Sequence, residues 1–508
     1  MSAWNEGYTT DVQYTSFFHA EIAPSHIAFA ALMAGQRAPD LSGAFSYCEL
    51  GSGQGVTLNA IAALHPQARF WGFDFNPAQI ANAARLADRA GLGNVQFRDW
   101  SFAQALDNEA QLPRFDVIAL HGILSWVSEQ NREEIVRFID RTLKPGGIVY
   151  ASYNTQPGWA QMAPFRQLAR EHYLRHPGRS DLHVPSILAF ADAFTEIGAA
   201  YFKANPVVEK RLEAMRKQPA AYLAHEFLNT HWEAFYVTDI ARQMAGARLD
   251  YMTSATLIEN VAVASLPPGV TAMLADHMPD DRLWQELAKD FACNKMFRRD
   301  LYVRGLNPLS ATDHAAMLGE LRLALAVPRE AVKLAFQGPV GEAGGAAAVY
   351  DPILDRLAKG AASFGELIAV TPGKDRAKTL QAVTLLVHSK QVLPVADKVD
   401  GKAARVLNIV LTAAQFAGES YGVVVAPKAR TALQVSGDEL MLLGGLLAGR
   451  KTAAEAAGHA VERLAANGRA PQQEGKALKG EAAVAFLTGR FAPLMEAKLG
   501  VWKDLGII

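Results

Sequence analysis

The feature that most constrains this chain is a glycine-rich loop that follows a short apolar run. The loop reads Glu49-Leu50-Gly51-Ser52-Gly53-Gln54-Gly55, with a glycine at every second position. Glycine lets a backbone turn tightly and approach a ligand without a Cβ in the way. The helix predicted over residues 57–64 would point its free N–H groups at that ligand. The segment predicts a strand, a ligand-binding turn and a helix, and the alternative is an ordinary tight turn.

The residues around this loop bear on the ligand. A dinucleotide fingerprint needs glycine or alanine three residues after its second glycine, and Val56 stands there instead. Glu49 is placed to meet a cationic amino group. S-adenosylmethionine (SAM) carries an ammonium and a sulfonium, whereas a dinucleotide carries a pyrophosphate. The pattern therefore favours SAM over a nicotinamide dinucleotide.

Two later strand ends offer further acidic and aromatic side chains. Asp74 and Phe75 close the next apolar strand, about 20 residues beyond the loop, where an acid is placed to bind ribose hydroxyls. Asp99 and Trp100 close a third strand and offer an acceptor for an adenine amino group and an apolar wall. The alternative interpretation of Asp99 is a helix N-cap, and capping does not exclude binding.

A fourth strand is predicted over residues 115–120 from its continuous apolar run, and His121 and Trp126 follow it. A fifth strand, residues 148–153, ends in Tyr153. Ligands of open parallel sheets bind beyond the carboxyl ends of the strands, so these ends should lie near the reacting methyl group. The alternation of strands and helices predicts an α/β fold with a Rossmann-like, doubly wound sheet.

These runs resemble the class I SAM-dependent methyltransferases, and more narrowly those with a methyltransferase regulatory domain. The resemblance covers residues 8–305. This group of methyltransferases is similar to the protein-lysine methyltransferases of rickettsial bacteria, which modify outer-membrane proteins. The runs that carry it, beside the glycine loop, are Phe73-Asp74-Phe75-Asn76-Pro77-Ala78-Gln79, Leu120-His121-Gly122-Ile123, Ser152-Tyr153-Asn154-Thr155-Gln156-Pro157-Gly158-Trp159 and Tyr14-Thr15-Ser16-Phe17-Phe18-His19-Ala20-Glu21-Ile22-Ala23-Pro24.

The residues expected to bind SAM, and its product S-adenosylhomocysteine, belong to the loop and to the strand ends. They are Glu49, Gly51, Ser52, Gly53, Gln54, Gly55, Asp74, Phe75, Asp99, Trp100, Leu120 and His121.

Composition limits the other classes of function. The chain has 508 residues, 50% of them hydrophobic and 20% charged, and a net charge of −1, so no extended nucleic-acid footprint is expected. Two cysteines provide neither a disulfide framework nor a zinc motif. Residues 1–11 lack the pattern of a signal peptide, and no apolar stretch approaches about 20 residues. These features predict a cytoplasmic protein without membrane insertion.

The domain organisation follows from pattern changes along the chain. Two strand-like pieces, residues 249–255 and 296–304, are expected to complete the central sheet as an antiparallel hairpin. The small-residue stretch Gly341 to Ala348 is interpreted as a linker, and helices followed by a strand over 351–396 suggest a winged-helix-like module that contacts protein rather than DNA. The expected parts are an N-terminal lid segment (1–42), the SAM-binding core (43–159), a helical insertion or regulatory domain (160–245), the last hairpin of the sheet (246–306), the winged-helix-like domain (307–400) and a C-terminal helical domain (401–508).

A metal site is not expected. His225 and His231 flank a glutamate, but their spacing puts them on different faces of a helix, unlike the His-Glu-x-x-His motif. Capping or packing is the expected role of this segment.

Methyl transfer from a sulfonium is an in-line displacement in which the enzyme supplies alignment, exclusion of water and an unprotonated nucleophile. The side chains expected to line the acceptor channel are Tyr14, His121, Trp126 and Tyr153. The two tyrosines would orient an amine, and His121 would accept a proton, with a structural hydrogen-bonding role as its alternative. The expected function is methylation of protein side chains at lysine, with a protein substrate and a possible homodimer. The alternatives are a small-molecule N- or O-methyltransferase and a SAM-binding regulator without activity.

Overall fold

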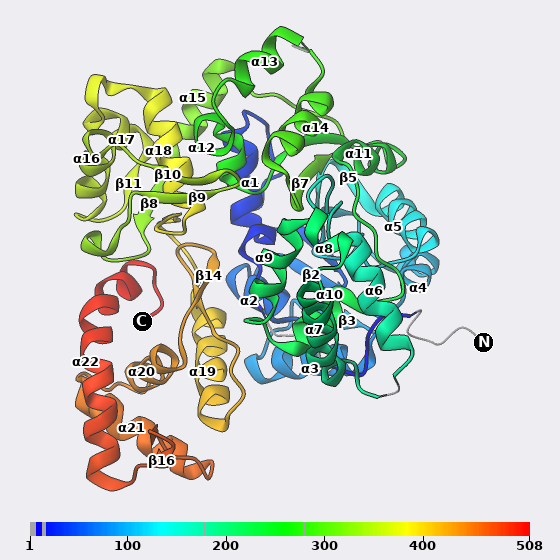
Figure 1. Ribbon diagram of the computed structural model, residues 1–508. Coiled ribbons are helices and arrows are strands. Elements are labelled where there is room, and N and C mark those ends of the chain that lie inside the picture. The colour runs from blue at the N-terminus through cyan, green and yellow to red at the C-terminus, as the bar shows by residue number, and fades with distance from the viewer. Residues whose placement is uncertain (1–6, 13–16, 177, 278–279) are drawn as a thin grey trace.

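The chain folds around a seven-stranded mixed sheet (Figure 1). The computed structural model describes residues 7–12, 17–176, 178–277 and 280–508. The sheet order is β3-β2-β1-β4-β5-β7-β6; the first five strands pair in parallel, and β7 pairs antiparallel with both β5 and β6. The strands are β1 (Ser46–Leu50), β2 (Arg69–Phe73), β3 (Val95–Arg98), β4 (Phe115–Leu120), β5 (Leu143–Asn154), β6 (Asp250–Ser254) and β7 (Phe297–Val303).

This topology confirms the predicted Rossmann-like sheet, and it also confirms that the pieces near 250 and 300 are its last two strands. They are neighbours but not a tight hairpin, because the helices η3 (Leu257–Asn260), α12 (Ala262–Ser265), α13 (Val270–His277) and α14 (Arg282–Cys293) separate them along the chain. The division of the whole chain into six parts remains a prediction.

Helices cover both faces of the sheet, and each face has its own apolar core. One face packs against α1 (Pro24–Met33), α2 (Val56–Leu64) and α3 (Pro77–Ala90). The other packs against α4 (Phe102–Asp107), α5 (Glu129–Thr142) and α11 (Val237–Ala245). Central strands are therefore apolar on both sides, which is why their sequences read as continuous apolar runs.

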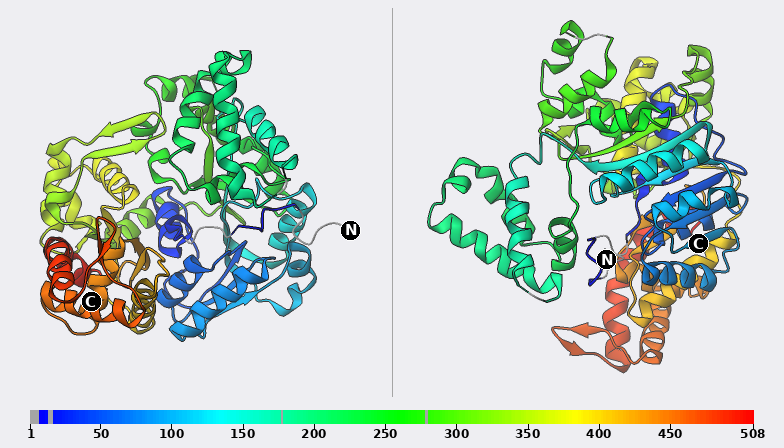
Figure 2. Two further views of the ribbon diagram at one scale, coloured as in Figure 1. Left: turned by 60° about the horizontal axis from the view of Figure 1, so that its bottom comes forward. Right: turned by 90° about the vertical axis from the view of Figure 1, so that its right-hand side faces the viewer.

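A cluster of helices follows β5 and stands away from the sheet (Figure 2, right). It has its own core, in which Phe165, Val208 and Leu223 are buried. Its helices are α6 (Ala163–Leu174), α7 (Ser180–Glu196), α8 (Ala200–Ala204), α9 (Pro206–Met215) and α10 (Ala220–Phe227). His225 on α10 is buried and lies 3.1 Å from the carbonyl oxygen of Val12, which is the packing role expected for it.

The next part of the chain builds a small three-stranded sheet, in the order β11-β8-β12, beside helices α16 to α18. The predicted linker is wrong: Gly341–Gly344 forms a strand paired with Ala335–Gly338, and helix α16 begins at Ala347. Strands pair through backbone hydrogen bonds, which glycine and alanine form as other residues do. A small-residue composition therefore did not distinguish this β-hairpin from a linker. The winged-helix interpretation remains a prediction. The elements are α15 (Ala311–Glu320), β8 (Arg322–Leu325), β9 (Ala335–Gly338), β10 (Gly341–Gly344), α16 (Ala347–Leu357), β11 (Ala362–Ser363), α17 (Phe364–Val370), α18 (Arg376–His388) and β12 (Val392–Pro394).

The last hundred residues pack back onto the half of the chain that contains the seven-stranded sheet. Helix α19 contacts α2 and α3, and its Leu407 and Leu411 join the core that covers that face of the sheet. The elements are α19 (Lys402–Ala417), β13 (Val423–Ala426), β14 (Thr431–Gln434), α20 (Gly437–Leu447), α21 (Ala453–Ala466), β15 (Gln472–Gln473), β16 (Lys476–Ala477) and α22 (Gly480–Asp504). Among the described residues, every helix is too short or too polar to cross a lipid bilayer.

Candidate functional site

The glycine loop joins β1 to α2 in a conformation that only glycine tolerates well. Gly51, Gly53 and Gly55 all have positive φ angles, of 75°, 53° and 66°. A Cβ on Gly51 would lie 2.1 Å from Cδ1 of Ile123, and a Cβ on Gly55 would lie 2.4 Å from Cβ of Ala83. The turn therefore favours glycine at all three positions, and close packing also excludes a side chain at Gly51 and Gly55.

Glu49 lies one residue before the end of β1, and its buried carboxyl group lacks part of its hydrogen bonding. The residue is 4% exposed, and Oε2 has no hydrogen-bond partner among the described residues. Burial, and then the nearby charge of Asp74, raise the pKa of Glu49 to about 8. A buried carboxylate without a cationic partner is costly, so this position fits a ligand that brings its own positive charge.

Asp74 ties the loop to the start of α3. Its Oδ2 accepts a hydrogen bond from the Gly53 amide at 2.9 Å, and its Oδ1 accepts one from the Asn76 amide at 2.9 Å. Burial raises the pKa of Asp74 to about 6, and these two hydrogen bonds hold the rise back. Each oxygen keeps a second lone pair, so the carboxylate can also accept hydroxyl groups of a ligand.

His121 stands directly after β4, beside the glycine loop, because Leu120 pairs with Leu50 in the sheet. Its Nδ1 lies 3.0 Å from the hydroxyl of Tyr150 and 3.4 Å from that of Ser152. Its ring stacks on the ring of His19, with centroids 3.7 Å apart. Burial, with smaller contributions from His19 and Arg299, holds the pKa of His121 well below its ordinary value.

His19 belongs to the same cluster. Burial lowers the pKa of His19 to about 4, so both imidazoles are neutral at pH 7. None of His19, Tyr150 and Ser152 was among the predicted site residues. Tyr150 and Ser152 alternate along β5 and so share one face, which is a signal that the sequence did contain. His19 comes from a segment before the sheet, and no local pattern predicts its contact with His121.

Comparison with known families agrees with this geometry. Residues 48–149 match the family model described as "Methyltransferase domain", and residues 219–304 match "Predicted methyltransferase regulatory domain". An uncharacterized protein of Synechocystis sp. is 41% identical over 365 residues, which cover 72% of this chain and 71% of that protein. The chain belongs to the class I SAM-dependent methyltransferases that carry a methyltransferase regulatory domain. Its cofactor is SAM.

Two further relatives of this methyltransferase come from Rickettsia. An uncharacterized protein of Rickettsia prowazekii is 28% identical over 291 residues, 57% of this chain and 51% of that protein. The structure of PKMT2 from Rickettsia typhi in complex with AdoHcy matches 96% of this chain and 99% of its own, with a TM-score of 0.71 at 17% identity. At that identity the match concerns the fold. The regulatory-domain model includes β6 and β7, so that domain completes the catalytic sheet.

The methyltransferase's own residues fit the cofactor. Bound SAM would place an ammonium where Glu49 has an unpartnered oxygen and ribose hydroxyls where Asp74 has free lone pairs. The hydroxyl of Ser52 is also buried without a partner among the described residues, and the side chain of Gln54 accepts a hydrogen bond from Asn82 at 3.0 Å.

The predicted adenine contacts lie at the end of β3. Asp99 is exposed, and Ser101 caps helix α4 by accepting a hydrogen bond from the Gln104 amide at 3.2 Å. The alternative N-cap role of Asp99 is therefore wrong. Trp100 stacks on Phe73 at 5.4 Å between centroids, which fixes the plane of its ring at this edge of the sheet.

Two other residues predicted to contact the cofactor, Phe75 and Leu120, differ in how far their side chains are buried. Phe75 is partly buried and meets Tyr8 edge-on, at 5.9 Å between centroids. Leu120 is fully buried, and its side chain belongs to the core on the side of α5. Any contact between Leu120 and the cofactor would therefore use its backbone.

The prediction that the Tyr153 hydroxyl orients an acceptor amine is wrong. Tyr153 has no exposed surface, and its hydroxyl donates to Oδ2 of Asp300 at 2.5 Å on the face of the sheet opposite to Tyr150. Asp300 in turn pairs with Arg298 at 2.8 Å, and Arg298 also pairs with Asp290 at 2.6 Å. The hydroxyl thus belongs to a buried ion network within the protein.

Two predicted catalytic residues remain, Trp126 and Tyr14. Trp126 is partly buried in the loop after β4, and a Cβ on Gly122 would lie 3.8 Å from its indole nitrogen. Tyr14 lies outside the described residues. Within the segment expected to form the lid (1–42), Phe18 is 2% exposed and packs in the core with α1 and α2, whereas its neighbour Phe17 is 49% exposed.

Proposed function

We propose that this enzyme transfers methyl groups to the side-chain amines of lysine residues in proteins. The observation that carries the proposal is the uncharged cluster of His19, His121 and Tyr150 at the carboxyl ends of β4 and β5. The sequence resemblance to rickettsial protein-lysine methyltransferases, and the shared fold with PKMT2 of Rickettsia typhi, support it.

The cluster suits an amine nucleophile. Bound SAM supplies an electrophilic methyl group. A lysine amine has an ordinary pKa of about 10.4 and attacks only after it loses its proton. Because His19 and His121 are neutral at pH 7, they neither repel an arriving amine nor return a proton to it. Burial raises the pKa of Tyr150 far above its ordinary value, so its hydroxyl stays protonated and keeps His121 in position.

The parts outside the SAM-binding core support a macromolecular acceptor. Helices α6 to α10 stand off from the sheet with a core of their own, and about 200 further residues follow β7 (Figure 2). A small metabolite needs far less surface than this. We therefore propose that these parts hold the protein that carries the acceptor lysine.

The experiment that tests this proposal supplies the full chain with methyl-labelled SAM and a protein extract of its own source. We expect label in a few protein bands and methylated lysine after their hydrolysis. The variant Glu49→Gln, which removes the carboxylate beside the glycine loop, should abolish labelling. The matched control Glu320→Gln changes an exposed glutamate at the end of α15 and should label like the wild type. Label confined to small molecules, or to other amino acids, would contradict the lysine assignment.

A further inference from the structure

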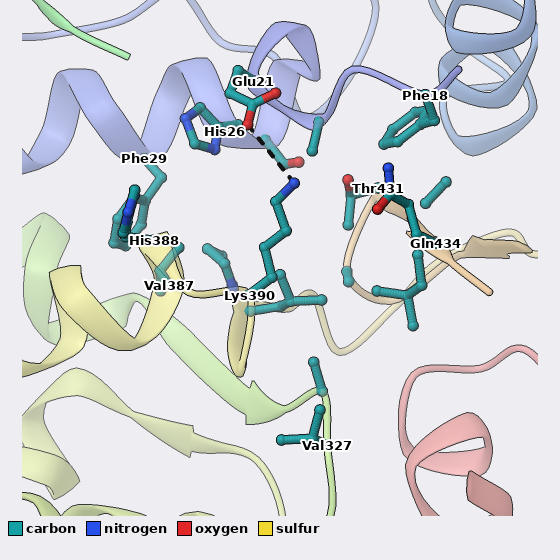
Figure 3. A pocket seen from close by; sticks show the side chains of 18 of the residues that line it. Phe18, Glu21, His26, Phe29, Val327, Val387, His388, Lys390, Thr431 and Gln434 are labelled. Atoms are coloured by element: carbon teal, nitrogen blue, oxygen red, sulfur yellow. Dashed lines mark ion pairs between the residues drawn. The ribbon is translucent and has the colours of Figure 1, made fainter. Parts of the chain in front are cut away.

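A cavity of about 300 Å³ lies between the catalytic sheet and the C-terminal half of the chain. Its walls come from the first helices, η1 (Ala20–Ile22) and α1, from the ends of β6 and β7, and from the segments around α18, β14 and α22 (Figure 3). His19 is not one of the residues that line it; it stacks on His121 instead. The cavity is thus distinct from the cluster of His19 and His121 at the end of β4. Helix η1 lines the cavity and directly follows His19.

The charged side chains that line this cavity leave an excess of positive charge. Glu21 lies 3.7 Å from Lys390 (Figure 3), and Lys498 lies 3.1 Å from Glu439, so these two lysines have partners. Arg299 forms no ion pair with any described residue. Its Nε is buried without an acceptor, and its Nη1 reaches only the hydroxyl of Thr256, at 3.4 Å.

The other polar groups do not offset this charge. Burial lowers the pKa of His26 and of His388, so both rings are neutral at pH 7. Burial alone would raise the pKa of Glu21, but the positive charges of Lys390 and Arg299 hold it at about 2, so Glu21 is ionised at pH 7 and its charge is balanced by Lys390. An acceptor lysine would be repelled from this cavity, whereas an anion would find an unpaired guanidinium and an accessible ammonium.

The rest of the wall is largely apolar. Phe29 and Val387 lie on the same side of Lys390 in the view of Figure 3. Trp502 of α22 also lines the cavity. A volume near 300 Å³ is at the small end of the range for ligand pockets. Apolar walls with a few convergent charges are typical of sites for small amphipathic molecules.

We propose that this cavity binds a small organic anion, with a carboxylate or phosphate group held by Arg299 and Lys390 and an apolar body packed along Phe29 and Val387. Such a ligand would displace Lys390 from Glu21 or share it. It would also bridge the catalytic half and the C-terminal half, since Arg299 comes from β7 and Lys390 from the turn after α18.

The proposal is tested by calorimetric titration of the full chain with four probes, in the presence of saturating S-adenosylhomocysteine so that the cofactor site is filled. The probes are 3-phenylpropionate, phenyl phosphate, the neutral 3-phenylpropanol and the cationic 3-phenylpropylamine. We expect both anions to bind at least tenfold more tightly than the alcohol, and the amine not to bind.

The matched variants are Lys390→Met, which keeps the length of the side chain and removes its charge, and Lys398→Met at an exposed position a few residues away. Lys390→Met should weaken anion binding at least tenfold and leave the alcohol unchanged, and Lys398→Met should behave like the wild type. Arg299→Gln provides a second variant, on another element, with the same expected loss. Equal binding of anion and alcohol, binding insensitive to both Lys390 and Arg299, or no binding by either anion would overturn the proposal.

Discussion

Glu49 should make cofactor binding depend on pH, and the size of the effect follows from its pKa. At a pKa of about 8, roughly nine in ten of these carboxyls are protonated at pH 7 in the free enzyme. An ammonium beside the carboxyl favours the charged form and lowers that pKa. Binding must therefore release a proton, at a cost of about 1.4 kcal/mol at pH 7, since one pKa unit corresponds to 1.36 kcal/mol. Between pH 6.5 and 7.5 the affinity should rise roughly eightfold as that cost falls.

The assay is calorimetric titration with S-adenosylhomocysteine, whose only cationic group is its ammonium. The pH range of 6.5 to 7.5 lies below the ordinary pKa of an α-amino group, about 8, and above the pKa of Asp74, about 6. Neither of these groups therefore dominates the change of affinity with pH. Repeating the titration in buffers of different ionisation enthalpy gives the number of protons released, expected near 0.9 at pH 7.

Two controls isolate Glu49. Glu49→Gln keeps the shape of the side chain and cannot ionise, so its affinity should be independent of pH over this range. Methylthioadenosine has no amino-acid part, so its affinity for the wild type should not follow the titration of Glu49 either. A wild-type affinity for S-adenosylhomocysteine that is flat from pH 6.5 to 7.5, with no proton released, would refute the assignment of the ammonium to Glu49.

Three other substitutions test the structure around the site. Arg298→Met should destabilise the fold by about 3–5 kcal/mol, because it leaves buried carboxylates without their partner; a urea midpoint close to that of the wild type would contradict the buried network. Tyr153→Phe removes a hydrogen bond to the Asp300 carboxylate and should cost about 1.5–3 kcal/mol of stability with no change in affinity for S-adenosylhomocysteine; lower turnover at unchanged stability would restore a role at the acceptor. Gly55→Ala would force alanine into a positive φ and place its Cβ 2.4 Å from that of Ala83. The free energy of unfolding should therefore fall by more than about 1 kcal/mol, and the cofactor affinity should fall too. Wild-type thermal melting and wild-type cofactor titration would disprove the requirement for glycine at this position.

The cofactor could be predicted from the sequence because the chemistry that indicates it is local. A glycine at every second position, with Glu49 before it and Asp74 at the next strand end, requires only neighbouring residues and one strand pairing. The sheet was predictable for the same reason, since each strand was a compact apolar run. The order of its last two strands depended on the resemblance to class I methyltransferases.

The acceptor half was not predictable in the same way. Strand β5 is buried on both faces, so its apolar run does not indicate which side chains face the site. Tyr153 was chosen because it ends the strand, but Tyr150 and Ser152 are the residues beside His121. His19 reaches that cluster from a segment about 100 residues earlier, and only the assembled fold shows the contact.

Two arginines near the start of β7 show what the segment that matches the regulatory-domain model contributes to the catalytic sheet. Arg298 and Arg299 are consecutive, so their side chains lie on opposite faces of the strand. Arg298 anchors the buried carboxylates of Asp290 and Asp300 on one face. Arg299 lies on the other face, where it helps to keep His19 and His121 uncharged and lines the proposed anion cavity. A single strand of the segment that matches the regulatory-domain model therefore contributes both to the buried ion network of the sheet and to the electrostatics of the histidine cluster.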